Sequence, residues 1–264
     1  MALLYDLKSL LFKVKRFAVK LIRRWVPSTW LVINKRLRRM GLIIAVIGCD
    51  GSGKSTIAEE IRNWLSWKFE VKKIYLGSGD GYFSIYKMIK QLLLKKTEKN
   101  SRSRQRLSKM KDKNPLVVFL ENINYVKISF RCRRLIKRAY IYAKRGGIVV
   151  ADRYPQVQFF GIADGPKIKD EASFLGRIER RNLAYCAKCC PDVVIKLQAP
   201  YDVIMERRKN DNKDEIKKKI KIVNELKFDG AYIICKDAGM PFERELLEIK
   251  QEVWKCIYKT GCLK

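Results

Sequence analysis

The chain has 264 residues, of which 47% are hydrophobic, enough for one α/β core but cramped for two large independent domains. Lysine and arginine number 58 against 27 acidic residues, which gives a formal net charge of +31. Such a positive field favours anionic partners, namely nucleotides, nucleic acid or an acidic membrane surface, and charge alone does not choose among them.

The cysteines and the first residues of the sequence indicate the cellular compartment in which the protein is expected. Eight cysteines in a chain of this length are not a disulfide scaffold, and no secretory leader pattern opens the sequence, so we expect a cytoplasmic protein. Cys186, Cys189 and Cys190 form a C-x-x-C-C cluster that could bind zinc if Cys256 or Cys262 came close. Because the chain has no histidine and no second C-x-x-C, buried thiols along a helix are favoured instead.

Residues 1–40 form a basic extension, and residues 1–25 predict an amphipathic helix. Its charges exclude a membrane-crossing segment. The apolar stripe could make peripheral contact with an anionic membrane, on its inner face, through residues 1–26. It could equally pack on the main domain or on a second copy in a homodimer. Apolar residues recur at steps of four and three, at Leu3, Leu7, Leu10, Val14, Phe17, Leu21 and Trp25.

Residues 41–264 alternate between strand and helix patterns. This predicts a three-layer α/β/α fold with a parallel sheet of about five strands. The basic residues of 95–113 outnumber the acidic ones by nine to two, so this segment is expected to be a mobile insertion. The expected strands are 42–47, 71–76, 147–151, 192–197 and 231–235. The expected helices run from the first glycine-rich loop to about 69, then over 84–94, 115–144, 171–189, from 199–200 through ERRKND, and over 241–258.

The stretch GCDGSGKST follows the first strand and fits the phosphate-loop pattern G-x-x-x-x-G-K-[ST]. Its backbone N–H groups and the following helix N-terminus are expected to cradle the phosphates of ATP or another nucleoside triphosphate. Lys54 should reach the β- and γ-phosphates, and the Ser55 hydroxyl should ligate Mg²⁺. The candidate nucleotide-binding residues in this loop are Gly48, Asp50, Gly51, Ser52, Gly53, Lys54, Ser55 and Thr56.

Two further candidate site residues, Asp152 and Arg153, follow the strand expected at 147–151. Asp152 lies where ligands of open α/β sheets gather, and its carboxylate is the candidate partner of Ser55 for Mg²⁺. Arg153 beside it can donate two parallel hydrogen bonds to a phosphate, which lysine cannot do.

With these motifs in order, residues 42–258 resemble the thymidylate kinases, which are P-loop nucleoside monophosphate kinases. The loop DGSGKST and the sequence DRY at 152–154 carry the resemblance. It implies that Asp50 touches the sugar hydroxyl of the acceptor, that Arg153 holds the acceptor monophosphate, and that Tyr154 belongs to the substrate site. The similar spacing of Arg131 implies an arginine that reads the base.

The resemblance extends to the ATP side. Residues 199–208 are similar to the helix that leads into the family's mobile lid, expected here at about 205–215. It implies that Arg207 and Arg208 join Lys54 and Arg153 as catalytic residues. The residues after the last strand are similar to the family's adenine-side turn, which implies nucleotide contacts from Asp237 and Ala238.

Two departures leave the acceptor open. Lys127 stands where the family has a base-stacking phenylalanine, and PQVQFFGIADGPKI replaces the family's segment after DRY. The favoured function is an ATP- and Mg²⁺-dependent kinase of dTMP or a related nucleotide, in nucleotide biosynthesis. The alternative acceptor is a sugar, a lipid-linked compound or another phosphate monoester. An NTPase that binds nucleic acid through residues 8–39 and 95–113 is least favoured, because no recognised nucleic-acid motif is present.

Overall fold

The computed structural model describes residues 36–37, 40–77, 115–208, 212–237, 239 and 241–259. These belong to the compact unit that begins at Arg36, whereas residues 1–35 form a separate unit outside the described residues. The helices expected at 1–25 and 84–94 and the basic segment 95–113 also lie outside the described residues and stay predictions.

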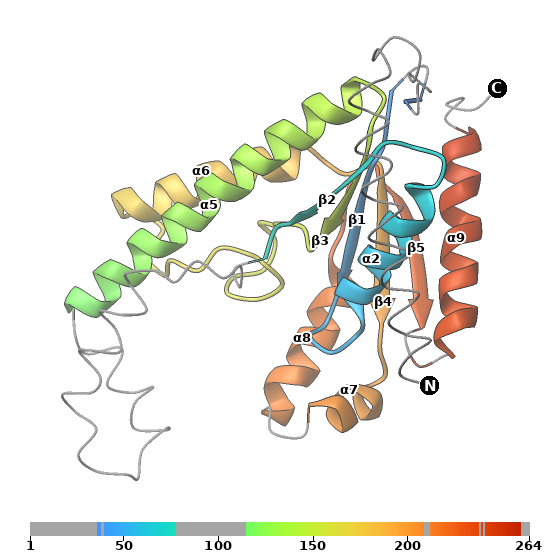
Figure 1. Ribbon diagram of the computed structural model, residues 1–264. Coiled ribbons are helices and arrows are strands. Elements are labelled where there is room, and N and C mark those ends of the chain that lie inside the picture. Colours follow the sequence, from blue (N-terminus) through green and yellow to red (C-terminus); the bar gives the residue numbers. More distant parts are fainter. Residues whose placement is uncertain are drawn as a thin grey trace, which may run out of the picture. The chain divides into compact units, whose positions relative to one another are not determined.

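A parallel five-stranded sheet forms the centre of the described fold (Figure 1). The strand order is β2-β3-β1-β4-β5, and each neighbouring pair is parallel. The sequence-based prediction of an α/β fold with about five parallel strands is therefore confirmed. The strands are β1 (Ile43–Gly48), β2 (Val71–Tyr75), β3 (Ile148–Asp152), β4 (Val193–Gln198) and β5 (Tyr232–Asp237).

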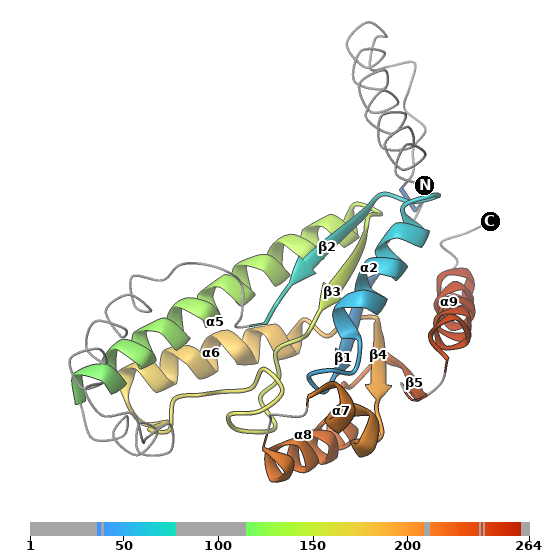
Figure 2. The ribbon, with the colours of Figure 1, turned by 60° about the horizontal axis from the view of Figure 1, so that its bottom comes forward.

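Helices cover both faces of the sheet. Figure 2 shows α5 and α6 running side by side over one face, with α9 on the other side of the sheet. Among the described residues, no helix combines the length and the apolar character that a membrane span needs. The helices are α2 (Lys54–Leu65), α5 (Pro115–Lys144), α6 (Phe174–Lys188), α7 (Tyr201–Arg207), α8 (Lys213–Glu225) and α9 (Phe242–Lys259).

The central strands are buried on both faces because successive side chains alternate between two apolar layers. In β1, Ile44 and Val46 join the core beneath α2 and α9, whereas Ile43, Ala45 and Ile47 join the core beneath α5 and α6. The same alternation holds in β3. This two-sided burial explains why the strands read as continuous apolar runs.

The sequence-based helix boundaries differ from the structure by more than two residues in three places. The helix expected to run to about residue 69 ends at Leu65. The helix expected from residue 171 begins at Phe174, because the Ser173 hydroxyl accepts a hydrogen bond from the Gly176 N–H at 3.1 Å and caps the helix there. The helix expected from 199–200 through ERRKND ends at Arg207, and a further helix, which was not expected, follows it. This helix, α8, begins after Asn212, whose side chain accepts the N–H of Asp214 at 2.9 Å.

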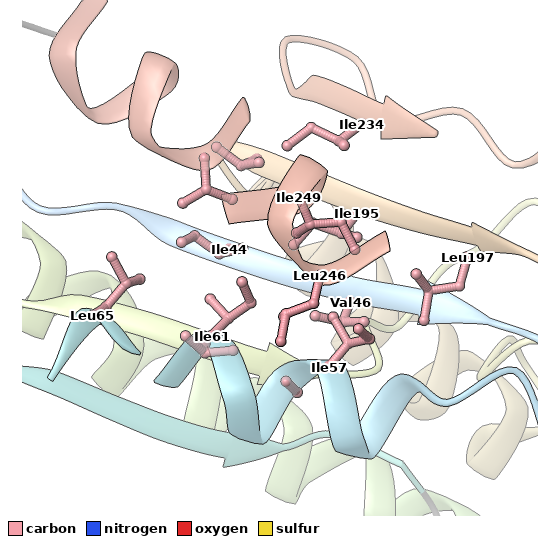
Figure 3. Close-up of a cluster of buried hydrophobic side chains, with 14 of the residues drawn as sticks. Ile44, Val46, Ile57, Ile61, Leu65, Ile195, Leu197, Ile234, Leu246 and Ile249 are labelled. Carbon is pink, nitrogen blue, oxygen red and sulfur yellow. The ribbon is translucent and has the colours of Figure 1, made fainter. Parts of the chain in front are cut away.

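Removing volume from the central core should destabilise the protein strongly. Ile44 is fully buried among side chains of α2, β4 and α9 (Figure 3). We expect Ile44→Ala to lower the free energy of unfolding by about 2–5 kcal/mol, because transfer and cavity costs add. Urea-induced unfolding followed by circular dichroism measures this. Trp67→Ala is the control, since Trp67 is 92% exposed, and equal losses in both variants would contradict the assigned core.

Candidate functional site

The phosphate loop connects β1 to α2 at the carboxyl ends of the central strands. Gly51 and Gly53 have positive φ angles of 92° and 86°, a conformation that costs glycine little. As N-cap of α2, Gly53 supplies no side-chain hydrogen bond, and the first turn of the helix has no acidic residue. The helix N-terminus therefore keeps free N–H groups and an uncompensated positive dipole end, which together suit a phosphate.

Lys54 lies inside this loop with only 5% of its surface exposed. Its ammonium donates a hydrogen bond to the carbonyl oxygen of Cys49 and lies 3.7 Å from Oδ1 of Asp50. Burial and the neighbouring Arg153 charge lower the pKa of Lys54. Since burying this cation is costly without an anion, the position favours a ligand that brings negative charge.

Asp50 is the centre of a cluster of charges. Its Oδ1 accepts a hydrogen bond from the Arg153 guanidinium at 2.6 Å, and its Oδ2 lies 3.8 Å from Nζ of Lys219. Burial raises the pKa of Asp50, but the hydrogen bond and charge of Arg153, with the Lys54 charge, hold it below its ordinary value. Asp50 is therefore an anion shared by Lys54, Arg153 and Lys219.

Arg153 follows β3 directly and has an unusual backbone. Its φ of 72° lies in the left-handed region, which disfavours side chains larger than glycine. The register pairs Asp152 with Val46, and the Arg153 N–H donates to the Val46 carbonyl at 3.0 Å, so the residue is held beside the loop strand. Strain of this kind is typical of functional positions.

The residues present fit a magnesium ion. Asp152 is 2% exposed, and within the described part of the chain its Oδ1 has no hydrogen-bond partner. A buried carboxylate oxygen without a partner is costly, and Mg²⁺ or its bound water would satisfy it. Ser55 lies exposed in the first turn of α2, next to Lys54. Asp152 and Ser55 are therefore the pair that would hold the ion.

The segment after DRY forms a tight loop organised by Gln156. The side-chain amide of Gln156 donates to the carbonyls of Phe159 and Ile162, both at 2.7 Å, and its Oε1 accepts the Phe159 N–H at 2.7 Å. Ala163 and Asp164 then adopt left-handed φ angles of 50° and 59°. This turn places Asp164 3.5 Å from the Arg153 guanidinium. Burial raises the pKa of Asp164, while Arg153 opposes the shift.

These side chains line one cavity. Its charged lining residues are Asp50, Lys54, Arg153, Asp164 and Lys219, so three cations face two carboxylates and a positive surplus is left. Asp164 also lines a neighbouring cavity between α5, α6 and the end of β2. Two anions or one extended phosphorylated ligand would fit these adjoining cavities, which share Asp164 as a lining residue.

Two of the predicted residues on the ATP side lie beside the phosphate loop. The Arg207 guanidinium donates to the carbonyl of Gly51 at 2.9 Å, and the Arg208 side chain packs beside the same glycine. Neither arginine lines the cavity itself. Asp237 accepts the N–H of Gly239 at 2.8 Å in a turn after β5, and Ala238 lies outside the described residues, as does the middle of the predicted lid, 209–211.

Two predicted substrate residues have structural contacts. The Arg131 guanidinium donates to the carbonyl of Gly77 and ties α5 to the end of β2. The Tyr154 ring borders the cavity, but its hydroxyl donates to the carbonyl of Cys189 at the end of α6. Their substrate contacts stay predictions.

Sequence reasoning missed Asp164 and Lys219. The tripeptide ADG marks a turn, but nothing in it shows that the carboxylate points towards an arginine eleven residues earlier. Lys219 stands in the basic run KKKIK, where no lysine differs from its neighbours by type. The spacing of Ile216, Ile220 and Val223 and the Asn212 cap could have revealed α8, and from it the face that carries Lys219.

Comparison with known proteins agrees with this site. A family model described as an AAA domain matches residues 38–122, which include the phosphate loop. The "Uncharacterized ATP-binding protein YghR" of Escherichia coli strain K12 is 30% identical over 222 residues, covering 80% of this chain and 85% of that protein. The "Uncharacterized ATP-binding protein YghS" of the same strain is 26% identical over 213 residues, covering 77% of this chain and 89% of that protein.

Proposed function

This chain belongs to the family of the Escherichia coli protein YghR, and from that premise we propose that it is an ATP- and Mg²⁺-dependent phosphotransferase. The family model, the phosphate loop and the parallel sheet make it a P-loop NTPase. The name of YghR supports ATP as the nucleotide. The proposed acceptor is the phosphate of a nucleoside monophosphate, as in the thymidylate kinases that the sequence resembles.

One observation favours phosphoryl transfer to an acceptor over simple ATP hydrolysis. Arg153 comes from β3 and faces Lys54 of the phosphate loop across the same cavity, with Asp50 between them. Hydrolysis needs only a water molecule opposite the γ-phosphate. A partly buried guanidinium in that place suits a second phosphate, because a guanidinium binds phosphate oxygens through two parallel hydrogen bonds.

The proposed reaction is an in-line displacement. An oxygen of the acceptor phosphate attacks the γ-phosphorus, the bond to the bridging oxygen breaks, and the electron pair leaves with ADP. Lys54 would bind the β- and γ-phosphates in place of the Cys49 carbonyl, and Arg153 would orient the acceptor. Mg²⁺, held by Asp152 and Ser55, would neutralise charge on the phosphates. No proton has to move, so the lack of histidine is no obstacle.

A second acceptor class is favoured by Asp164. Its carboxylate lies between the phosphate-loop cavity and the cavity against α5, where it could accept a hydrogen bond from a hydroxyl group close to the acceptor phosphate. A sugar phosphate, a lipid-linked phosphate or another phosphate monoester would fit this chemistry. Membrane contact through residues 1–26 and homodimer formation also stay predictions.

An acceptor panel tests the proposal. Purified protein with ATP and Mg²⁺ is mixed in turn with each nucleoside and deoxynucleoside monophosphate and then with sugar phosphates, and ADP and phosphorylated product are both quantified. We expect stoichiometric ADP and product with at least one nucleoside monophosphate. Product from sugar phosphates alone would select the second acceptor class. If no acceptor stimulates ADP release and inorganic phosphate is the only other product, the protein is a hydrolase and the proposed transfer is refuted.

A further inference from the structure

Helix α8 forms a wall of the cavity that holds the phosphate loop. Lys219 and Val223 line that cavity and are four residues apart, so they share one face of the helix, and Leu226 lines it just beyond the helix end. The helix is held in place at both ends. Asn212 caps its start, and the buried Lys196 of β4 donates to the Leu226 carbonyl and, at 3.3 Å, to the Asn224 carbonyl at its end.

Lys219 is set apart from the other lysines of α8 by its surroundings. Its side chain is 30% exposed, and its Nζ lies 3.8 Å from Oδ2 of Asp50 and 2.8 Å from Oε1 of Glu215. Lys221, two residues later, has a side chain that is 77% exposed and pairs only on the surface, with Glu225 at 3.9 Å. Of these two lysines, Lys219 alone reaches the cavity.

Three cations converge on Asp50. One carboxylate is shared by the Arg153 guanidinium at 2.6 Å, the Lys54 ammonium at 3.7 Å and the Lys219 ammonium at 3.8 Å. Asp164, 3.5 Å from Arg153, and Glu215, 2.8 Å from Lys219, offset part of this positive charge, but all three cations line the cavity, where they would attract phosphate oxygens. Lys54 belongs to the loop side and Arg153 to the acceptor side of the proposed reaction. Lys219 is a third cation near Asp50, and it comes from a different element, helix α8.

We propose that Lys219 is a catalytic residue whose ammonium contacts the γ-phosphoryl group of ATP and stays on it during transfer. This inference rests on the proposed phosphotransfer. Lys219 supplies positive charge to the equatorial oxygens of the moving group, which carry the developing negative charge. We assign to Lys219 the catalytic role that the family resemblance implied for Arg207 or Arg208, because Lys219 lines the cavity and neither arginine does.

The test compares Lys219→Met with Lys221→Met. Both substitutions remove one lysine of α8 that pairs with a glutamate four residues away, and methionine keeps the apolar stem. In the Lys219 variant we expect turnover to fall about 10²-fold and ATP affinity to fall about tenfold, with ADP affinity changed less than about twofold. Lys219→Arg should turn over at least about tenfold faster than Lys219→Met, because arginine keeps the positive charge. Lys221→Met should match the parent.

Calorimetric titration with ATP and with ADP makes the test independent of the acceptor. If the parent transfers to no acceptor but Lys219→Met loses affinity for ATP and not for ADP, the proposed reaction fails and the γ-phosphate contact stands. Equal losses for ATP and ADP, or losses of the same size in Lys221→Met, would overturn the assignment. So would turnover in Lys219→Met within about threefold of the parent. A melting temperature equal to that of the parent shows that Lys219→Met is folded, and Lys219→Gln, which also removes the charge, repeats the comparison if it is not.

Discussion

Lys54→Met is expected to lower turnover by about 10²- to 10³-fold and to weaken ATP binding markedly, because the variant loses the cation inside the phosphate loop. Lys54 is 5% exposed and is held by the Cys49 carbonyl and Asp50, so its ammonium is positioned before the nucleotide arrives. The methionine keeps most of the side-chain volume. Calorimetric titration with ATP and Mg²⁺ measures the binding, and an ADP-detection assay measures the turnover.

The control for this prediction is Lys68→Met. Lys68 lies just after α2, exposed to solvent, with its ammonium 5.4 Å from the centre of the Trp254 ring. We expect parental binding in this variant. We also expect Lys54→Met to unfold at or above the parental temperature without ligand, because burying a charge is costly, and to lose the stabilisation that ATP confers on the parent. Parental ATP binding in Lys54→Met would refute the assigned phosphate site and everything proposed from it.

Arg153→Lys is expected to lower the specificity constant for the acceptor by about 10²- to 10³-fold while ATP affinity stays within about threefold of the parent. Lysine keeps the charge but cannot donate the two parallel hydrogen bonds that a guanidinium offers to a phosphate. Kinetics at varied acceptor and fixed saturating ATP separate the two effects. Loss of ATP binding with unchanged acceptor kinetics would move Arg153 to the ATP side and contradict its assigned role.

The backbone of Arg153 provides a second measurement at the same position. Arg153→Ala and Arg153→Gly both remove the guanidinium, but only glycine relieves the strain of a φ of 72°. We expect the glycine variant to be more stable than the alanine variant by about 1 kcal/mol. Both should be equally impaired in turnover, because the guanidinium and not the backbone contacts the acceptor phosphate.

Local patterns were sufficient for the sheet and for most helices. The apolar runs of β1, β3 and β4 could be recognised because each strand is buried on both faces. The helix predicted from residue 115 to about 144 is confirmed as Pro115–Lys144, since it begins at a proline and ends just before a pair of glycines. Helix α8 was missed. Its signal, the Asn212 cap, lies within a polar stretch that reads equally well as part of one helix or as a loop.

Some site residues could likewise be predicted from the sequence, and others could not. Asp152 and Arg153 could be singled out because they end a strand beside the expected loop, which is a consequence of chain order. The contacts of Arg131 and Tyr154 could not be predicted, because they depend on which neighbouring carbonyl each side chain reaches, those of Gly77 and Cys189. Asp164 required the turn that Gln156 builds, and no local propensity specifies its direction.

The amino-acid sequence by itself determined the phosphate loop, because a nest of backbone N–H groups needs only nine consecutive residues between a strand and a helix. Tertiary structure alone decided which charges meet there. Arg153 lies 103 residues from Asp50, and Lys219 comes from a helix beyond β4. Their approach follows from the strand order and from the packing of α8, both of which are set by long-range burial of apolar side chains.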